Sequence, residues 1–280
     1  MPRFAQEDSH EAEGHTYGVY LCEGDPELVP DLAARVKELY LGAPDRELSR
    51  TLENALEGLD TVVSTDFIGE MIQQMAEAVV PPPGTAPELA PQLDIARNEL
   101  AEVIAYEAVD QVHGAVIPAL RVREKESPLP SRGLDLLAFV QEGDDLTLLV
   151  TEVKASSDAA SPPGVVESGE SCLDAQTRAI IGNAQRILAE LVWARKHASP
   201  ETQDLVTQAI ILHGLGELRL SASPVLLRPR SALGADDFGC FRADAGRYDP
   251  ATVRFIVVVI EEELDELSEA VYSSARAAAA

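Results

Sequence analysis

The chain has 280 residues, of which 46% are hydrophobic, so it is long enough to bury a substantial core. Its formal net charge of −26 argues against a protein that binds nucleic acid over its whole surface, because such binding depends on neutralising phosphates. A DNA or RNA substrate would need a locally basic cleft, a metal ion or a partner protein. A salt-adapted or high-GC source would also explain an acidic chain with 18 Arg and 4 Lys, and both explanations fit the composition.

Targeting signals and metal-binding cysteine patterns are missing from the sequence. No run approaches the roughly 18 apolar residues of a membrane span, and residues 1–15 lack both the apolar core of a signal peptide and the basic face of a transit peptide. We therefore expect a soluble, cytoplasmic protein. Cys22, Cys172 and Cys240 are widely spaced, which indicates neither a zinc site nor a disulfide framework.

The first part of the chain is predicted to be mainly helical. Residues 1–16 are polar and acidic and are expected to form a disordered tail, and "TYGVYLC" (16–22) is typical of a short strand. Apolar residues at three- and four-residue spacing then predict three helices, at 26–41, 45–59 and 64–80. We interpret residues 17–80 as an N-terminal helical lobe and the proline-rich 81–91 as a linker.

The pattern changes in residues 92–280, where helices and strands mix. Long helices are predicted at 92–112, 172–198 and 200–215, and an acidic amphipathic helix at 261–280. Strands are predicted at 114–124, in a hairpin within 132–156, at 223–230 and at 251–260. This order predicts an α/β domain in which a mixed central sheet is flanked by helices.

Three charged residues stand out in the predicted hairpin. Asp135 precedes the first strand, and Glu152 and Lys154 end the second, so the hairpin would bring them to the same end of the sheet. Because side chains alternate along a strand, Glu152 and Lys154 would share one face, with Val153 on the other. An exposed Glu–Lys ion pair at a strand end is the plain structural alternative, worth under about 1 kcal/mol.

Two carboxylates and a lysine suit metal-assisted hydrolysis. Asp135 and Glu152 could hold Mg²⁺ (or Mn²⁺), which prefers oxygen ligands and keeps several waters. Such an ion lowers the pKa of a bound water and offsets charge in the transition state. Lys154 could orient the attacking water or stabilise the charge that develops on the phosphate.

These residues resemble a known superfamily. Gly133-Leu134-Asp135 on one strand and Glu152-Val153-Lys154 on the next are similar to the PD-(D/E)XK nucleases, which have a restriction-endonuclease-like core. The resemblance implies that Asp135 and Glu152 bind metal and that Lys154 is catalytic. Leu134 stands where the superfamily usually has proline, which is a common variation.

A wider set of segments resembles one family in particular. "RNELAEVIAYEAV", "IPALRVREKES", "RGLDLLAF", "TEVKAS" and the ending "FIVVVIEEELDELSEAVY" are similar to HamA, the nuclease subunit of the Hachiman antiphage system. The resemblance covers roughly residues 92–275. It implies a DNA substrate and a helicase-type ATPase partner that binds DNA and restrains the nuclease until activation. The N-terminal lobe is then the expected docking surface for that partner.

Glutamates of the helix before the sheet are candidates for an additional metal ligand. Relatives often use one such residue, and Glu102 matches the resemblance best. Glu99 remains an alternative because it lies nearer the apolar side of the helix. A solvated helix face explains either residue equally well.

Two further features could contact the substrate. A dense basic cluster precedes Asp135 and could bind the phosphate backbone, although pairing with Glu124 and Glu126 is an even alternative. Its members are Arg121, Arg123, Lys125 and Arg132. Gln176 opens the helix after the hairpin and could contact substrate or orient the lysine, although such residues more often only start a helix.

The leading hypothesis is therefore a metal-dependent nuclease that acts in antiphage defence beside a helicase-type partner. The alternative is an interaction module that keeps a catalytically inactive nuclease fold and binds a basic protein through its negative charge. Retention of Asp135, Glu152 and Lys154 together favours the nuclease.

Overall fold

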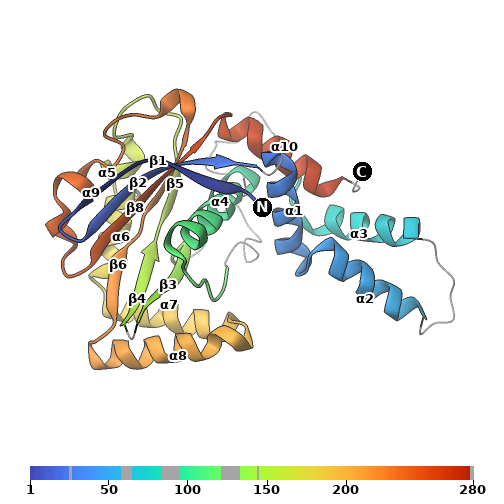
Figure 1. The fold of residues 1–280 in the computed structure, drawn as a ribbon, viewed down its shortest axis with the longest axis horizontal. Coiled ribbons are helices and arrows are strands. Elements are labelled where there is room, and N and C mark those ends of the chain that lie inside the picture. The colour runs from blue at the N-terminus through green and yellow to red at the C-terminus, as the bar shows by residue number, and fades with distance from the viewer. Residues whose placement is uncertain (25–26, 58–64, 84–94, 121–132, 144, 278–280) are drawn as a thin grey trace.

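A mixed β-sheet flanked by helices organises the molecule, as Figure 1 shows. The computed structural model describes residues 1–24, 27–57, 65–83, 95–120, 133–143 and 145–277. The predicted α/β class is thus confirmed. No helix within these ranges is long and apolar enough to cross a bilayer.

The described strands form one eight-stranded sheet. They are β1 (Arg3–Ala12), β2 (His15–Glu23), β3 (Leu136–Glu142), β4 (Asp145–Thr151), β5 (Val153–Ala155), β6 (Arg219–Ala222), β7 (Val225–Pro229) and β8 (Thr252–Ile260). Their order is β1-β2-β8-β6-β4-β3, and β7 lies between β5 and β8. Only β1–β2 and β3–β4 pair antiparallel, and the other pairs are parallel.

Two pairs of consecutive strands, β4–β5 and β6–β7, are each separated by a short break at the same level of the sheet. The break between β4 and β5 is at Glu152, and the break between β6 and β7 is at Ser223–Pro224. Main-chain hydrogen bonds join the two breaks to each other. The Ser223 N–H donates to Val150 O (2.9 Å), and the Val225 N–H donates to Glu152 O (3.0 Å). The two breaks therefore do not disrupt the hydrogen bonding between the β4–β5 segment and the β6–β7 segment.

Helices cover both faces of the sheet. The described helices are α1 (Leu28–Leu41), α2 (Asp45–Glu57), α3 (Thr65–Val79), α4 (Ile95–His113), α5 (Gly164–Glu167), α6 (Leu173–Ile181), α7 (Ala184–His197), α8 (Pro200–Leu215), α9 (Cys240–Ala243) and α10 (Leu264–Arg276), with 3-10 turns at Arg230–Ala232 and Ala245–Tyr248. Leu136 and Val153 pack toward α4, α1 and α10. Leu137 and Val150 pack toward α6, α7 and α8. Alternation along the strands divides the core into these two layers.

Helices α2 and α3 extend away from the sheet in Figure 1, beyond α1 and α10. The three helices expected in the N-terminal part are confirmed, each within a few residues of its predicted bounds. The linker predicted at 81–91 lies largely outside the described residues. Because β2 pairs in parallel with β8, residues 16–21 belong to the central sheet and not to a separate helical lobe.

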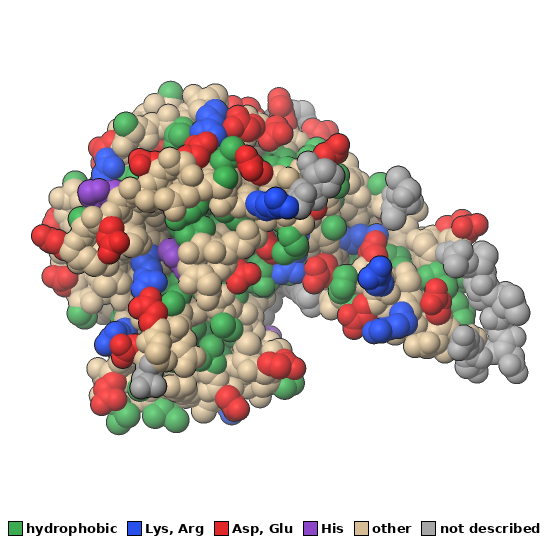
Figure 2. Space-filling view, viewed as in Figure 1, with side chains coloured by type: hydrophobic (Ala, Val, Ile, Leu, Met, Phe, Trp, Pro, Cys, Tyr) green, Lys and Arg blue, Asp and Glu red, His purple; other side chains and the backbone are tan. Residues whose placement is uncertain are grey.

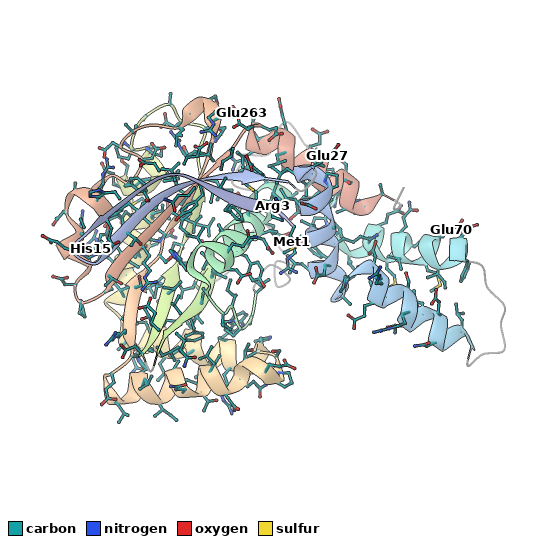
Figure 3. The ribbon with its side chains drawn as sticks, in the orientation of Figure 1. Met1, Arg3, His15, Glu27, Glu70 and Glu263 are labelled. Carbon is teal, nitrogen blue, oxygen red and sulfur yellow. The ribbon has the colours of Figure 1, made fainter. Side chains whose placement is uncertain are left out.

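The predicted disorder of residues 1–16 is wrong. Strand β1 pairs with β2 from Arg3↔Glu23 to Ala12↔His15, through a two-residue turn in which Glu13 and Gly14 both have positive φ. Figure 3 marks Arg3 and His15 at opposite ends of this hairpin. The β1 side chains are almost all exposed, so their polarity concealed a strand that is held by main-chain hydrogen bonds.

Two other expectations also need correction. The strand predicted at 114–124 is reduced, within the described residues 114–120, to an isolated bridge between Val116 and Phe139. The helix predicted at 172–198 is split into α6 and α7, because the Asn183 side chain accepts the Arg186 N–H (3.0 Å) and starts a new helix. Strand β6, four residues long, was not predicted.

A buried arginine fixes the loop that follows β5. Arg228 on β7 is fully buried, and its Nε donates to Asp237 Oδ2 (3.0 Å). Its other nitrogens donate to the carbonyl oxygens of Ser156 (2.8 Å), Ala160 (3.2 Å) and Ala232. Removing one partner would leave an uncompensated buried charge.

We therefore expect Asp237→Ala to lower the free energy of unfolding by about 3–5 kcal/mol, measured by urea denaturation. The control is Arg219→Ala, which breaks the exposed Arg219–Asp145 ion pair (2.7 Å) and should cost less than about 1 kcal/mol. Equal effects of the two substitutions would show that Arg228 does not depend on its carboxylate partner.

Candidate active site

Asp135 and Glu152 meet where the β3–β4 hairpin opens. Leu136 and Thr151 form the last pair of the ladder, so the two carboxylate residues occupy the next position on each strand. The Asp135 Oδ2 atom accepts a hydrogen bond from the main-chain N–H of Val153 (2.9 Å). This bond holds Asp135 against the first residue of β5 in place of a continued strand pairing.

Glu152 is a buried carboxyl group beside another carboxylate. Its residue is only 3% exposed, and this burial raises the pKa of Glu152 well above its ordinary value. The negative charge of Asp135 raises the pKa of Glu152 further, whereas the cations of Lys154 and Arg186 lower it. The site therefore favours a neutral Glu152 or one added cation.

Lys154 shares the face of Glu152, as the strand pattern predicted. Val153 packs into the core toward α4, and alternation directs its two neighbours to the other face. Lys154 is partly buried, and its ammonium group has no hydrogen bond or ion pair within 4.0 Å to any residue that the structure describes. Its charge remains available to a ligand.

The donor set fits a hard divalent cation. Asp135 and Glu152 offer carboxylate oxygens, and the Val153 carbonyl lies on the same strand edge as the N–H that faces Asp135. A cation between the carboxylates would offset the repulsion that raises the pKa of Glu152. No cluster of three His, Cys, Asp or Glu side chains occurs in the described ranges, so water would complete the coordination.

The α4 glutamates lie elsewhere. Glu99 is fully buried and accepts hydrogen bonds from the hydroxyl groups of Tyr40 and Tyr272 (3.3 Å for Tyr272). Glu102 belongs to the same neighbourhood, since its charge raises the pKa values of both tyrosines. Helix α4 covers the sheet face opposite to the Glu152 and Lys154 side chains, so the structure does not bring Glu102 to this pair.

The other predicted substrate contacts are placed only in part. Residues Arg121, Arg123, Lys125 and Arg132 lie outside the described residues. Gln176 lies on α6, which packs against β4, and its Oε1 atom is buried with no hydrogen-bond partner in the described part of the chain. An unsatisfied buried amide oxygen is costly, which keeps Gln176 a candidate for contact with substrate or with Lys154.

A comparison with protein families identifies the chain. The family profile described as HamA matches residues 8–213, which is well over half of the chain and includes the whole β3–β5 region. The chain belongs to the HamA family. It is accordingly a component of the Hachiman antiphage defence system. Comparison with curated proteins and with solved structures gave no match.

One charged residue of this HamA-family site was not singled out by its sequence. Arg186 lies in the first turn of α7, and its guanidinium lowers the pKa of Glu152. The adjacent Ile187 packs in one apolar cluster with Leu134 and Val150. The only sequence signal was Asn183, a favourable N-cap that marks where α7 begins.

The raised pKa of Glu152 predicts a pH-dependent stability in the absence of metal. The folded protein holds a proton that the unfolded chain releases near the ordinary carboxyl pKa, so stability should fall as pH rises from about 5 toward 8. Glu152→Gln should flatten this dependence in urea unfolding with EDTA, whereas the exposed control Glu170→Gln should not. Saturating Mg²⁺ should also remove the loss. An equal pH slope in both variants would contradict the burial of Glu152.

Proposed function

We propose that this HamA-family protein is a metal-dependent nuclease that hydrolyses phosphodiester bonds, with DNA as its substrate and Mg²⁺ or Mn²⁺ as its cofactor. The observation that carries the proposal is the buried Glu152 carboxyl beside the partly buried Asp135 and beside Lys154, a cation without an ion-pair partner among the described residues. Carboxylates that repel one another inside an apolar sheet cost stability, which is typical of a functional site.

The residues divide the chemistry between them. Asp135 and Glu152 would hold the divalent ion, which supplies an activated water and offsets negative charge on the phosphate. The Val153 N–H fixes the orientation of Asp135. Lys154, on the Glu152 face, would donate hydrogen bonds to the attacking water or to a phosphate oxygen, where charge grows during the reaction.

The surface charge supports a role for a partner. Figure 2 shows acidic side chains spread over the viewed face with basic ones between them, and no broad basic area. With a net charge of −26, the chain repels a polyanion at long range. We propose that a helicase-type ATPase of the same defence system binds DNA, delivers it to the Asp135–Glu152 site and restrains cleavage before activation.

The negative charge also favours one second candidate, an inactive nuclease fold that binds a basic protein. The two functions differ in what Glu152 and Lys154 do. In the inactive module, neither side chain would affect any activity on DNA.

The test is plasmid cleavage with Mg²⁺ or Mn²⁺, by the full chain alone and with the protein encoded beside it. Glu152→Gln and Lys154→Ala should each lower the cleavage rate by at least about 100-fold, and EDTA should abolish cleavage. Glu170→Gln serves as the exposed control. Cleavage that survives both site substitutions would refute the assigned site, and no cleavage in any combination would favour the inactive module.

A further inference from the structure

Most basic side chains of this acidic protein have partners. Described arginines with little exposure form ion pairs or hydrogen bonds, for example Arg35 with Glu107 (2.6 Å), Arg228 with Asp237 (3.0 Å) and Arg254 with Glu142 (3.0 Å). Such pairing is expected where acidic residues outnumber basic ones by 48 to 22. A basic side chain that is partly buried and yet has no such partner therefore needs an explanation.

Within the described ranges, only Lys154 and Arg186 are partly buried cations whose side chains have neither a hydrogen bond nor an ion pair within 4.0 Å. The other basic side chains without partners in these ranges, Arg46, Arg50 and Lys196, are exposed to solvent. Both exceptions lie at one site, because Lys154 is on β5 two residues after Glu152, and Arg186 precedes Ile187, which belongs to the apolar cluster of Leu134 and Val150. Among the described residues, they are the two cations beside the carboxylate pair that have no such partner.

The position of Arg186 is set by packing that does not involve its guanidinium. Its main-chain N–H is capped by Asn183 Oδ1 (3.0 Å). Ile187, in the first turn of α7, belongs to the same buried apolar cluster as Leu134, next to Asp135, and Val150, two residues before Glu152. The start of α7 is thus held by its cap and by Ile187, and no hydrogen bond or ion pair of the Arg186 guanidinium within the described residues takes part in it.

We propose that Arg186 binds a non-bridging phosphate oxygen of the nucleic-acid backbone next to the bond that is cleaved. The inference rests on the proposed nuclease function and adds a substrate-binding residue from α7. A guanidinium matches phosphate geometry through two parallel hydrogen bonds, and it loses little hydration on binding. In a chain of such negative charge, a cation that has no carboxylate partner in the described part of the chain can receive the phosphate without breaking an ion pair seen there.

The test compares Arg186→Ala with Lys196→Ala, which removes an exposed cation without a described partner from the same helix. Cleavage of a duplex oligonucleotide is measured at several salt concentrations. Binding of the labelled duplex is measured by anisotropy with Ca²⁺ in place of Mg²⁺. Arg186→Ala should raise KM and Kd about 10-fold and lower the slope of log K against log salt by about 1, and Lys196→Ala should change neither. Arg186→Lys should be intermediate, because it keeps the charge but not the two parallel bonds.

The outcomes separate the two proposals. If Glu152→Gln abolishes cleavage while Arg186→Ala behaves like Lys196→Ala, the role of Arg186 is overturned and the nuclease function stands. Arg186→Ala could weaken duplex binding and reduce the salt slope while cleavage does not depend on Glu152. This result would support the phosphate contact of Arg186 and refute the proposed nuclease site. A wild-type chain that neither binds nor cleaves the duplex overturns both. Equal thermal melting of the variants excludes misfolding as the cause.

Discussion

The hydrogen bond from the Val153 N–H to the Asp135 carboxylate is the contact around which the site is built. This bond takes the place of the next β3–β4 pair. Strand β3 therefore begins only at Leu136, whereas the chain that pairs with it continues beyond Thr151 as β5. The interruption leaves Glu152 between two strands and facing Asp135.

Burying the Glu152 carboxyl beside the partly buried Asp135 has a cost in stability that the surrounding sheet must offset. The interior strands offset this cost, because β7 and β8 are almost wholly buried and apolar. Main-chain hydrogen bonds also continue across both strand interruptions. Arg228 also stabilises this region, because its hydrogen bonds join β7 to the loop that follows β5 and to Asp237. The arrangement keeps Lys154 on a fixed strand, although its charged end has no described partner.

Charge explains why the site residues stand apart from the rest of the chain. Partly buried basic groups elsewhere in the described structure are engaged by carboxylates or carbonyl oxygens, whereas those of Lys154 and Arg186 are not. An acidic surface repels a polyanion, and two cations without partners in the described ranges would attract it locally beside the Asp135–Glu152 pair. The function proposed for this HamA-family protein depends on that contrast, and on a partner that brings DNA across the repulsive surface.

Local pattern determined much of the molecule. Apolar spacing gave the helices, and alternation in the hairpin predicted both the register that joins Asp135 to Glu152 and the shared face of Glu152 and Lys154. Strand β1 was missed because its stability comes from main-chain pairing with β2, which leaves no hydrophobic signal. The split between α6 and α7 depended on a single cap, Asn183, inside an otherwise continuous helical pattern.

Tertiary structure decided which charged residues share a site. The sequence by itself determined the Asp135–Glu152–Lys154 group, because a hairpin relates residues by a local register that can be counted along the chain. It could not decide between Glu99 and Glu102 and gave no indication of Arg186, because all three lie on helices whose placement depends on the sheet face that each one covers. Helix α4 packs on the face opposite to the site and α7 packs beside it, so the folded chain assigns Arg186 to the site and the α4 glutamates to another part of the core.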